Sequence, residues 1–322
     1  MAAPKSPRKG SLQYWPRKRA SKLLPSANWN AISSNNTSGN LKGFICYKAG
    51  MLSAAIKDNT DKSMTKGKTK IVPVTVLSCP KLKIFSIRFY KYGKVAKEIL
   101  SGNFDNELKK KVKLPKKKEN LKADEIPSEG YDDIRVIVYS QVKKTGIKKK
   151  PDMTELGLTG SLEEKIKFIK GNLHKDMSIQ DVLKNEKIID VRGLTTGKGL
   201  QGPVKRFGVT LKSHKSEKGR RRPGSLGPWH PSRVTYRAAM AGQLGMFSRV
   251  TYNNKIMKIG SQEELSNEDK MKNMKNFGDV KTDYVILAGS IQGPAKRSLI
   301  MTLPLRPTKK QLKKDFELLE LR

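Results

Sequence analysis

The amino-acid sequence predicts a mainly β fold that carries an α/β insertion and two long basic extensions. Short runs of β-branched and aromatic residues begin at Phe44 and return after Ile188, as expected of sheet strands. The segment between these two blocks has helix start signals and a nearly balanced charge. Two further segments are strongly basic and rich in glycine or proline, and these residues disfavour a long helix.

The first basic extension spans residues 1–40, and the sequence has no acidic residue before Asp58. Its candidate contacts are Lys5, Arg8, Lys9, Arg17, Lys18, Arg19 and Lys22. Four prolines and an Asn/Ser-rich tract predict that this extension becomes ordered only on a partner. Tyr14, Trp15 and Trp29 lie among the basic residues. Such rings can stack on unpaired bases, or they can pack on the protein's own core.

Residues 41–100 and 188–305 are expected to form one discontinuous β domain. The first block contains the runs FICYKAGMLSAAIKD, IVPVTVLSC and LKIFSIRFYKYG, and the second contains IIDVRG, DYVILAGSI and SLIMTLPL. The last residues, 306–322, predict a C-terminal helix in which Thr308 is the N-cap and Gln311 completes a capping box.

Residues 101–187 predict a separate α/β insertion. More than half of the acidic residues of the chain lie in it or directly after it, together with a lysine run and one clear strand, IRVIVYS. Two helices are expected to follow. Ser161 with Glu164, and Ser178 with Asp181, have the spacing of a capping residue and its partner three positions later.

The second basic extension, 198–258, lies inside the β domain. It holds fourteen Lys or Arg, eight glycines, one acid, Glu217, and one tryptophan, Trp229, in a Gly-Pro-Trp-His-Pro turn. Like charges at this density repel one another and cannot be buried unpaired, so we expect a strongly negative partner. The glycines permit an extended backbone, and Trp229 with His230 is expected to form a tip that stacks on or wedges between bases.

Lys and Arg side chains are the candidate polyanion contacts of the central extension and of one nearby turn. They are Lys198, Lys205, Arg206, Lys212, Lys215, Lys218, Arg220, Arg221, Arg222, Arg233, Arg237, Arg249, Lys255, Lys258, Lys296 and Arg297. The run around Arg220 also resembles a nuclear-localisation signal, but such a signal has no need of the Trp229 turn that follows it.

The whole chain has 67 Lys and Arg against 29 Asp and Glu, a formal charge of +38. A magnitude of about 2 to 8 is enough to keep a small domain soluble, so nucleic acid is the expected partner. No apolar run approaches the roughly 20 residues that span a bilayer, and we expect no membrane partner. A DNA-compacting protein would share the charge, but repeated basic tails are more typical of that class.

Cys46 and Cys79 lack metal-ligand spacing and indicate a reducing cytoplasm.

One stretch imitates a cofactor motif. Residues 197–202 read GxGxxG after an expected strand. A dinucleotide site also needs a helix that begins at the third glycine and an acid about 20 residues further on. Pro203 and the basic residues after it indicate a strand-like context instead, and Glu217 is the only acid in reach. We expect these glycines to let the backbone approach a phosphodiester chain closely.

The sequence contains no recognisable catalytic constellation. His174, His214 and His230 have no paired carboxylates or nucleophile motif beside them, so an enzyme would lack a candidate base. An RNA-modifying enzyme is the remaining alternative, and it would depend on the GxGxxG stretch for its cofactor. We therefore expect no enzymatic activity, no metal site and no small-molecule substrate.

Several stretches, in the same order, resemble the universal large-subunit ribosomal protein three family in its archaeal and eukaryotic form. They are GSLQYWPRKRA, FICYKAGM, IDVRGLTTGKGLQGPVKRFGV, RRRPGSLGPWHPSRV, AGQLGMFSRVTYNNKIMKIG and GSIQGPAKR. The similarity covers nearly the full length. The chain is shorter than typical eukaryotic members, which favours an archaeal one.

The resemblance implies a six-stranded β-barrel of the translation-factor type, with the insertion and both extensions attached to it. It implies a structural role in the large subunit of the cytoplasmic ribosome, early subunit assembly, and placement of the factor-binding region. The implied partners are large-subunit rRNA and neighbouring ribosomal proteins, with no cofactor apart from Mg²⁺ carried by the rRNA. It also assigns Trp229 to the tip near the peptidyl transferase centre, and we expect Trp15 to stack on a base as well. Eukaryotic members carry a modified histidine where this chain has Glu217, so that modification is not expected.

Overall fold

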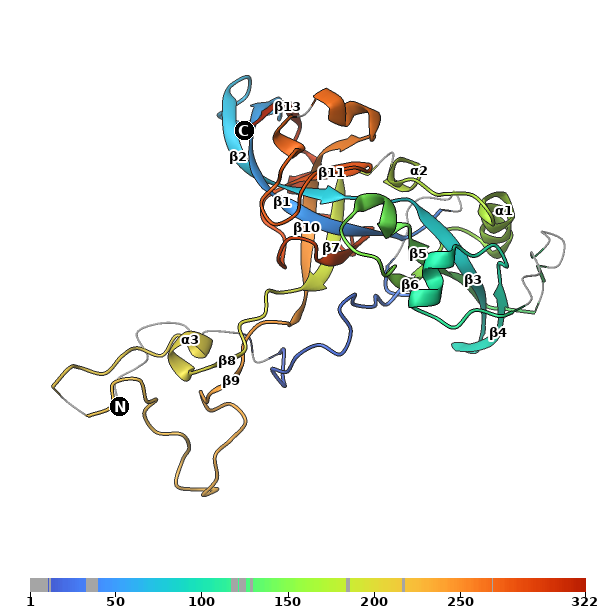
Figure 1. Cartoon of the computed structure of the whole chain (residues 1–322). Coiled ribbons are helices and arrows are strands. Elements are labelled where there is room, and N and C mark those ends of the chain that lie inside the picture. Colours follow the sequence, from blue (N-terminus) through green and yellow to red (C-terminus); the bar gives the residue numbers. More distant parts are fainter. Residues whose placement is uncertain are drawn as a thin grey trace. The chain divides into compact units, whose positions relative to one another are not determined.

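The computed structural model describes residues 11, 13–32, 40–116, 121, 126–127, 130–183, 186–215, 218–267 and 269–322. The chain divides into two compact units (Figure 1). The extension unit comprises Met1–Lys22 and Leu194–Ser248, and the sheet unit comprises Leu23–Gly193 and Arg249–Arg322. The sequence pattern predicts an N-terminal extension up to residue 40, whereas the structure assigns the residues from Leu23 onward to the sheet unit.

The sheet unit contains a seven-stranded sheet in the order β12-β7-β10-β11-β2-β1-β13. Its strands are β1 (Gly43–Asp58), β2 (Thr69–Ser78), β7 (Ile188–Leu194), β10 (Ser248–Gly260), β11 (Tyr284–Ala288), β12 (Ser298–Thr302) and β13 (Phe316–Leu321). Strand β12 pairs with β1 as well as with β7, so hydrogen bonds link six of these strands in a ring. The prediction of a mainly β fold is confirmed.

Strand β1 is long enough to pair with two different strands along one edge. Residues 43–47 pair with β12 and residues 54–58 pair with β13, while β2 runs along the other edge. The register shifts between Lys48 and Gly50, where an irregularity bends the strand. A Cβ on Gly50 would lie 2.8 Å from Met274 Cε, the end of a flexible side chain that packs against this bend.

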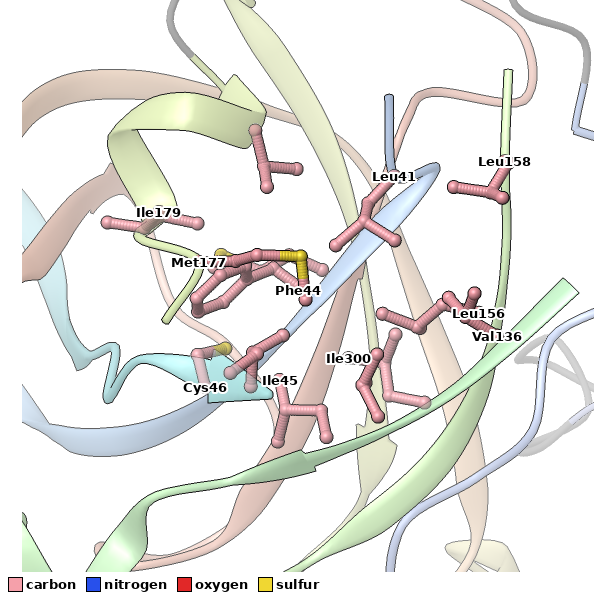
Figure 2. Close-up of a cluster of buried hydrophobic side chains, with 14 of the residues drawn as sticks. Leu41, Phe44, Ile45, Cys46, Val136, Leu156, Leu158, Met177, Ile179 and Ile300 are labelled. Carbon is pink, nitrogen blue, oxygen red and sulfur yellow. The ribbon is translucent and has the colours of Figure 1, made fainter. Parts of the chain in front are cut away.

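The first half of β1 is buried on both faces because it lies between two sheets. Figure 2 shows Phe44 and Ile45 of β1 with Ile300 of β12, and close to them Val136 and Leu156 of the second sheet. Fully burying side chains of this size contributes about 1.5–3 kcal/mol each. This shared core explains why FICY reads as a continuous apolar run rather than an alternating one.

The second sheet has four antiparallel strands in the order β4-β3-β5-β6. They are β3 (Leu82–Lys91), β4 (Lys94–Leu100), β5 (Asp133–Ser140) and β6 (Met153–Gly157). The sequence pattern assigns everything up to residue 100 to the discontinuous β domain, but β3 and β4 belong to this inserted sheet. The composition of LKIFSIRFYKYG suits either sheet, and only the long-range pairing of β3 with β5 decides between them.

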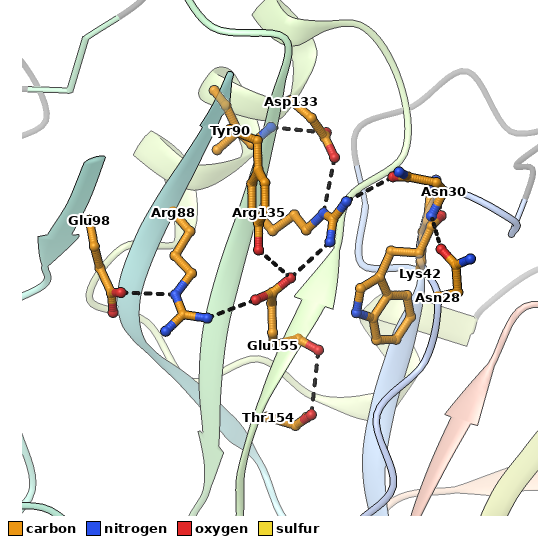
Figure 3. A network of polar contacts seen from close by, with 12 residues as sticks. Asn28, Asn30, Lys42, Arg88, Tyr90, Glu98, Asp133, Arg135, Thr154 and Glu155 are labelled. Atoms are coloured by element: carbon orange, nitrogen blue, oxygen red, sulfur yellow. Dashed lines mark hydrogen bonds and ion pairs between the residues drawn. The ribbon is translucent and has the colours of Figure 1, made fainter. Parts of the chain in front are cut away.

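Glu155 of β6 lies at the centre of a polar network on this sheet (Figure 3). It accepts hydrogen bonds from Arg88 at 2.9 Å, from Arg135 at 3.0 Å and from the Tyr90 hydroxyl at 2.9 Å. Burial alone would raise the pKa of Glu155, but the hydrogen bonds from Arg135, Tyr90 and Arg88 lower it. The charges of this face are therefore paired within the sheet.

Both helices of the insertion begin as predicted. Ser161 Oγ accepts from Glu164 N at 3.3 Å, and Glu164 Oε2 accepts from Ser161 N at 3.0 Å, which completes a capping box. Ser178 and Asp181 form the equivalent reciprocal pair. The helical elements of the sheet unit are α1 (Leu162–Asn172), α2 (Ile179–Leu183) and α4 (Lys309–Leu312), with 3₁₀ turns η1 (Asn106–Lys110), η3 (Val142–Thr145), η4 (Glu263–Asn267) and η5 (Asp269–Met271). No helix in the described part of the chain is long and apolar enough to cross a bilayer.

The predicted C-terminal helix over 306–322 is wrong in its second half. Only α4 is helical, and Thr308 makes no side-chain cap hydrogen bond there. The following FELLEL forms β13, which pairs with the second half of β1. The free edge of β1 offers backbone hydrogen bonds to this segment, and that tertiary pairing overrides its local helix propensity.

Trp29 is a core residue of the sheet unit with 3% of its surface exposed. It packs against two glycines, since a Cβ on Gly43 or Gly157 would lie 3.1 Å or 2.8 Å from atoms of the Trp29 side chain. Lys42 Nζ donates to the Trp29 backbone carbonyl at 3.3 Å. Of the two roles open to the N-terminal aromatic residues, packing on the protein's own core applies to Trp29.

The extension unit has little regular structure in its described part. It contains β8 (Leu200–Gln201), β9 (Gly242–Gln243), which pairs with β8, and α3 (Pro203–Phe207). The expectation of a strand-like context after Gly202 is wrong, because α3 begins there with Gly202 as N-cap. Proline suits the first helical position, where its missing N–H has no partner to lose. Gly208 ends α3 at φ 65°, a left-handed conformation that glycine adopts without strain.

Candidate nucleic-acid interface

Positive charge is concentrated in the extension unit. Its sequence holds eighteen Lys or Arg and one acid, Glu217. Glu217 and the predicted contacts Lys5, Arg8 and Lys9 lie outside the described residues. The predicted contacts that are exposed in this unit are Lys18, Arg19, Lys22, Lys198, Lys205, Lys215, Lys218, Arg220, Arg221, Arg222, Arg233 and Arg237, while Lys212 is half-buried. A polyanion can therefore reach most of the predicted side chains.

Trp15 is half-buried in a small aromatic cluster of the extension unit. The centroid of its ring lies 6.3 Å from that of Phe207, with the planes at 19°, and 5.7 Å from that of Tyr236, at 76°. The Arg17 guanidinium carbon lies 4.4 Å from the Phe207 ring centroid and 5.4 Å from that of Trp15. These contacts join the N-terminal segment to the central extension. They give Trp15 protein partners, so its stacking on a base remains a prediction.

Arg206 is the second link between the two segments of this unit. Its Nε donates to Gln243 O at 3.0 Å, its Nη1 to Met240 O at 3.0 Å and its Nη2 to Arg17 O at 3.4 Å. Burial lowers the pKa of the Arg206 guanidinium from its ordinary value. The sequence pattern predicts an RNA contact for Arg206. In the structure its guanidinium instead hydrogen-bonds to backbone carbonyls and links α3, β9 and the N-terminal segment.

Trp229 is 85% exposed in a turn that is held by a side-chain-to-backbone hydrogen bond and by close backbone packing. Ser232 Oγ donates to Trp229 O at 2.6 Å. A Cβ on Gly227 would lie 2.9 Å from Arg233 O, so this approach of two backbone segments requires glycine. His230 beside the tryptophan is exposed as well. An exposed indole on a turn that is fixed in this way can stack on a base or wedge between bases.

The close approach of two segments of the extension unit depends on Gly245, whereas a Cβ on Gly199 or Gly202 would have no atom within 4 Å. Lys198 N donates to Leu244 O at 2.9 Å. On the facing segment, a Cβ on Gly245 would lie only 2.0 Å from Thr196 O. The helix that follows, α3, has five residues. It does not form the strand-turn-helix unit that a dinucleotide site needs.

Lys255 and Lys258, for which the sequence pattern predicts RNA contacts, are engaged within the sheet unit. Lys255 is 8% exposed, and its Nζ donates to Lys314 O at 2.6 Å. Lys258 Nζ lies 3.1 Å from Glu264 Oε2. Burial alone would lower the pKa of Lys258, but hydrogen bonds with Glu264 and Tyr284 raise it. These two amines support the fold, and Arg249 of the same strand is half-buried.

The turn between β11 and β12 is fixed by Lys48, a residue that the sequence pattern did not single out. Lys48 is 8% exposed, and its Nζ donates to Ile291 O at 2.5 Å and to Gly293 O at 3.1 Å. Burial lowers the pKa of its amine. The turn presents Lys296 in an exposed left-handed position at φ 67°, whereas Arg297 is half-buried. A lysine inside the apolar run FICYKAG is the signal that could have identified this support.

The described residues contain no group of three or more His, Cys, Asp or Glu side chains that could hold a metal ion. His174 Nε2 lies 3.2 Å from Leu121 O, and His214 and His230 are exposed in the extension unit. Cys46 and Cys79 are buried free thiols, and burial raises the pKa of each.

Comparison with known proteins identifies the family of this chain. The family model for ribosomal protein L3 matches residues 1–321. The chain is 36% identical over 320 residues to the large ribosomal subunit protein uL3 of Methanocaldococcus jannaschii, covering 95% of this chain and 93% of the relative. It is 39% identical to the proteins of the same name from Methanococcus vannielii and Archaeoglobus fulgidus, each match covering 94% of this chain and, respectively, 92% and 93% of the relative. The match over the whole chain shows that the protein belongs to the ribosomal protein L3 family.

Proposed function

We propose that this chain is a structural constituent of the large ribosomal subunit, without enzymatic activity, and that it binds rRNA through its extension unit. One observation carries the binding role. Exposed basic side chains gather in the same unit as a fixed turn that presents Trp229. Lys198, Lys205 and Lys218 form no ion pair with a carboxylate in the described part of the chain. Phosphates of rRNA would supply the missing negative charge and release their counterions on binding.

The finer architecture is part of this proposal. Six hydrogen-bonded strands linked in a ring are consistent with a barrel of the translation-factor type. Trp229 would reach the RNA near the peptidyl transferase centre. Neighbouring ribosomal proteins would be further partners in the cytoplasmic ribosome, and Mg²⁺ would be present only through the bound rRNA. Support comes from the family match and from the exposure of Trp229.

Salt-dependent binding tests the proposal. The full chain is titrated with large-subunit rRNA and, separately, with duplex DNA of equal length at several salt concentrations. If about half of the twelve exposed basic side chains contact phosphates, the slope of log K against log salt is about −5 for the rRNA. Preferred binding to the rRNA supports the proposal. Equal affinity for both nucleic acids at every salt concentration would contradict it.

A matched pair of variants locates the interface. Lys218→Gln with Arg221→Gln and Arg222→Gln removes three exposed charges from the extension unit and should reduce the size of the slope by about 2 to 3. A control variant removes three exposed charges from the inserted part of the sheet unit, by Lys94→Gln, Lys97→Gln and Lys113→Gln. The control has the same net charge, so a difference between the two variants reports on position rather than on total charge.

A further inference from the structure

We propose that the sheet unit carries a second phosphate-binding site, a lysine-lined pocket where the β1–β2 hairpin meets the C-terminal segment, and that this hairpin pocket takes backbone phosphates of rRNA. The pocket is a cavity of about 430 Å³. Five lysines line it, together with two aspartates and Phe316. These lysines are Lys62, Lys70, Lys310, Lys313 and Lys314. The identity of the polyanion rests on the proposed function, whereas the pocket itself rests on the geometry that follows.

The two aspartates of the pocket are already neutralised. Asp58 is 2% exposed and accepts from Lys70 Nζ at 2.7 Å, and from the hydroxyls of Thr65 and Ser63 at 2.7 and 3.0 Å. The hydrogen bond from Lys70 holds the pKa of Asp58 well below its usual range. Asp61 pairs with Lys66 at 2.6 Å, outside the pocket lining.

Four lysines of the pocket keep an uncompensated charge. Lys62, Lys310, Lys313 and Lys314 form no ion pair with a carboxylate among the residues that the structure describes. Lys62, Lys310 and Lys313 are exposed, and Lys314 Nζ lies 6.0 Å from the centroid of the Phe316 ring. Amines that gather from two separate segments repel one another, and an anion bound between them would relieve this repulsion.

The two segments that supply these lysines are fixed to each other. Asn59 N donates to Asp315 O at 2.9 Å, and Asp315 N donates to Thr60 Oγ1 at 3.0 Å. The pairing of β1 with β13 continues these bonds into the sheet. The buried amine of Lys255 donates to Lys314 O and so fixes the C-terminal segment to β10. The pocket is therefore pre-formed, which reduces the ordering that a ligand would have to impose.

The backbone at Lys62 has an unfavourable conformation. Lys62 has φ 59°, the left-handed region in which a side chain other than Gly, Asn or Asp is unfavourable by about 1–2 kcal/mol. Its side chain is exposed and makes no ion pair in the described part of the chain that would offset this strain. The lysine at this position places a cation at the pocket, although a glycine would adopt this backbone conformation with less strain.

A phosphodiester chain fits this site better than a carboxylate peptide. Lysine acts as a compact, rotatable point charge, whereas planar carboxylates are recognised best by the two-pronged guanidinium of arginine, and the pocket lining contains no arginine. An RNA strand also presents one charge per nucleotide, so consecutive phosphates can meet amines from both segments. The hairpin pocket would then anchor the sheet unit to rRNA independently of the extension unit.

The test compares two variants of the full-length chain. The pocket variant carries Lys62→Gln, Lys310→Gln and Lys313→Gln, and the control variant carries Lys94→Gln, Lys97→Gln and Lys113→Gln. All six residues are exposed, so both variants are expected to fold, and circular dichroism spectra matching that of the wild-type chain are the check on this. Binding to large-subunit rRNA is measured over a range of salt concentrations. The pocket variant should lower the size of the salt slope by about 2 to 3, against less than about 1 for the control.

A second measurement uses the unmodified chain. Amine-selective acetylation is mapped by mass spectrometry with and without rRNA, and bound rRNA should reduce the reactivity of Lys62, Lys310 and Lys313 at least 5-fold, but not that of Lys94. Equal salt slopes for the two variants, or unchanged acetylation of the pocket lysines, would overturn the inference. Loss of binding to poly-glutamate but not to rRNA in the pocket variant would also overturn it and indicate an acidic protein partner. Failure of the wild-type chain to prefer rRNA would instead count against the proposed function.

Discussion

Removing the Arg206 side chain should loosen the extension unit while leaving the sheet unit intact. The guanidinium donates to three backbone carbonyls at 3.0, 3.0 and 3.4 Å and is half-buried. A hydrogen bond that involves a charged group contributes about 1.5–3 kcal/mol. Water can replace part of these contacts in Arg206→Ala, because the site is only half-buried. We therefore expect the free energy of local opening to fall by about 2 kcal/mol in total.

Hydrogen exchange measures this effect residue by residue. The amides of Lys198, Leu244 and Gly208 donate within the extension unit at 2.9 Å, and they should be protected in the wild-type chain. A loss of about 2 kcal/mol corresponds to exchange that is roughly 30-fold faster in Arg206→Ala. Amides of β1 and β2 in the sheet unit should exchange at their wild-type rates.

Lys205→Ala is the matched control for this experiment. Lys205 is the exposed neighbour of Arg206 on α3 and carries the same charge. The control should leave the exchange rates within about 2-fold of wild type, because no described hydrogen bond of its side chain is lost. Equal exchange in the two variants would refute the structural role of Arg206. Absence of protection in the wild-type chain would refute the fold of the whole unit.

Three further outcomes follow from single residues. Trp29→Ala should lower the free energy of unfolding by about 3–5 kcal/mol, measured by urea denaturation, because the ring is buried, whereas the exposed Trp229→Ala should change it by less than about 0.5 kcal/mol. An equal effect of both changes would contradict the assignment of core and tip. Ser161→Ala removes an N-cap and should cost about 0.5–2 kcal/mol in the same assay, and an unchanged midpoint would argue against the capping box. Glu155 has a lowered pKa in the folded chain, so its carboxylate stabilises the fold above an unfolded pKa of about 4.3, and this contribution is lost as the pH falls through the folded value. Glu155→Gln should therefore make stability less steep in acid, and an unaltered pH profile would show that the network is not coupled to folding.

Local signals predicted much of the architecture. The capping pairs at Ser161 and Ser178 depend on residues three apart, and the structure shows both of them. The apolar runs placed most strands, including the seven residues at the start of β1 that are buried on both faces. Composition alone located the basic extension unit, because uncompensated charge cannot be buried anywhere in a fold.

Long-range pairing accounts for the errors. Strand β3 joins β5 rather than the larger sheet, and the FELLEL segment becomes a strand because the free edge of β1 accepts it. The sequence pattern also could not separate exposed cations from structural ones. Arg206, Lys255 and Lys258 are engaged within the protein, while Lys62, Lys310 and Lys313 were overlooked because their segments are distant in sequence and adjacent only after folding.

Salt-dependent co-sedimentation with large ribosomal subunits tests the central claim most directly. The full-length chain and its Lys218→Gln, Arg221→Gln, Arg222→Gln variant are mixed with subunits that lack the protein, and the bound fraction is measured as salt increases. The wild-type chain should sediment with the subunits at about 0.1 M salt and be released only at a much higher concentration, while the variant should be released at lower salt. A wild-type chain that stays in the supernatant at low salt, or a variant released at the same salt concentration as wild type, would contradict binding through the extension unit.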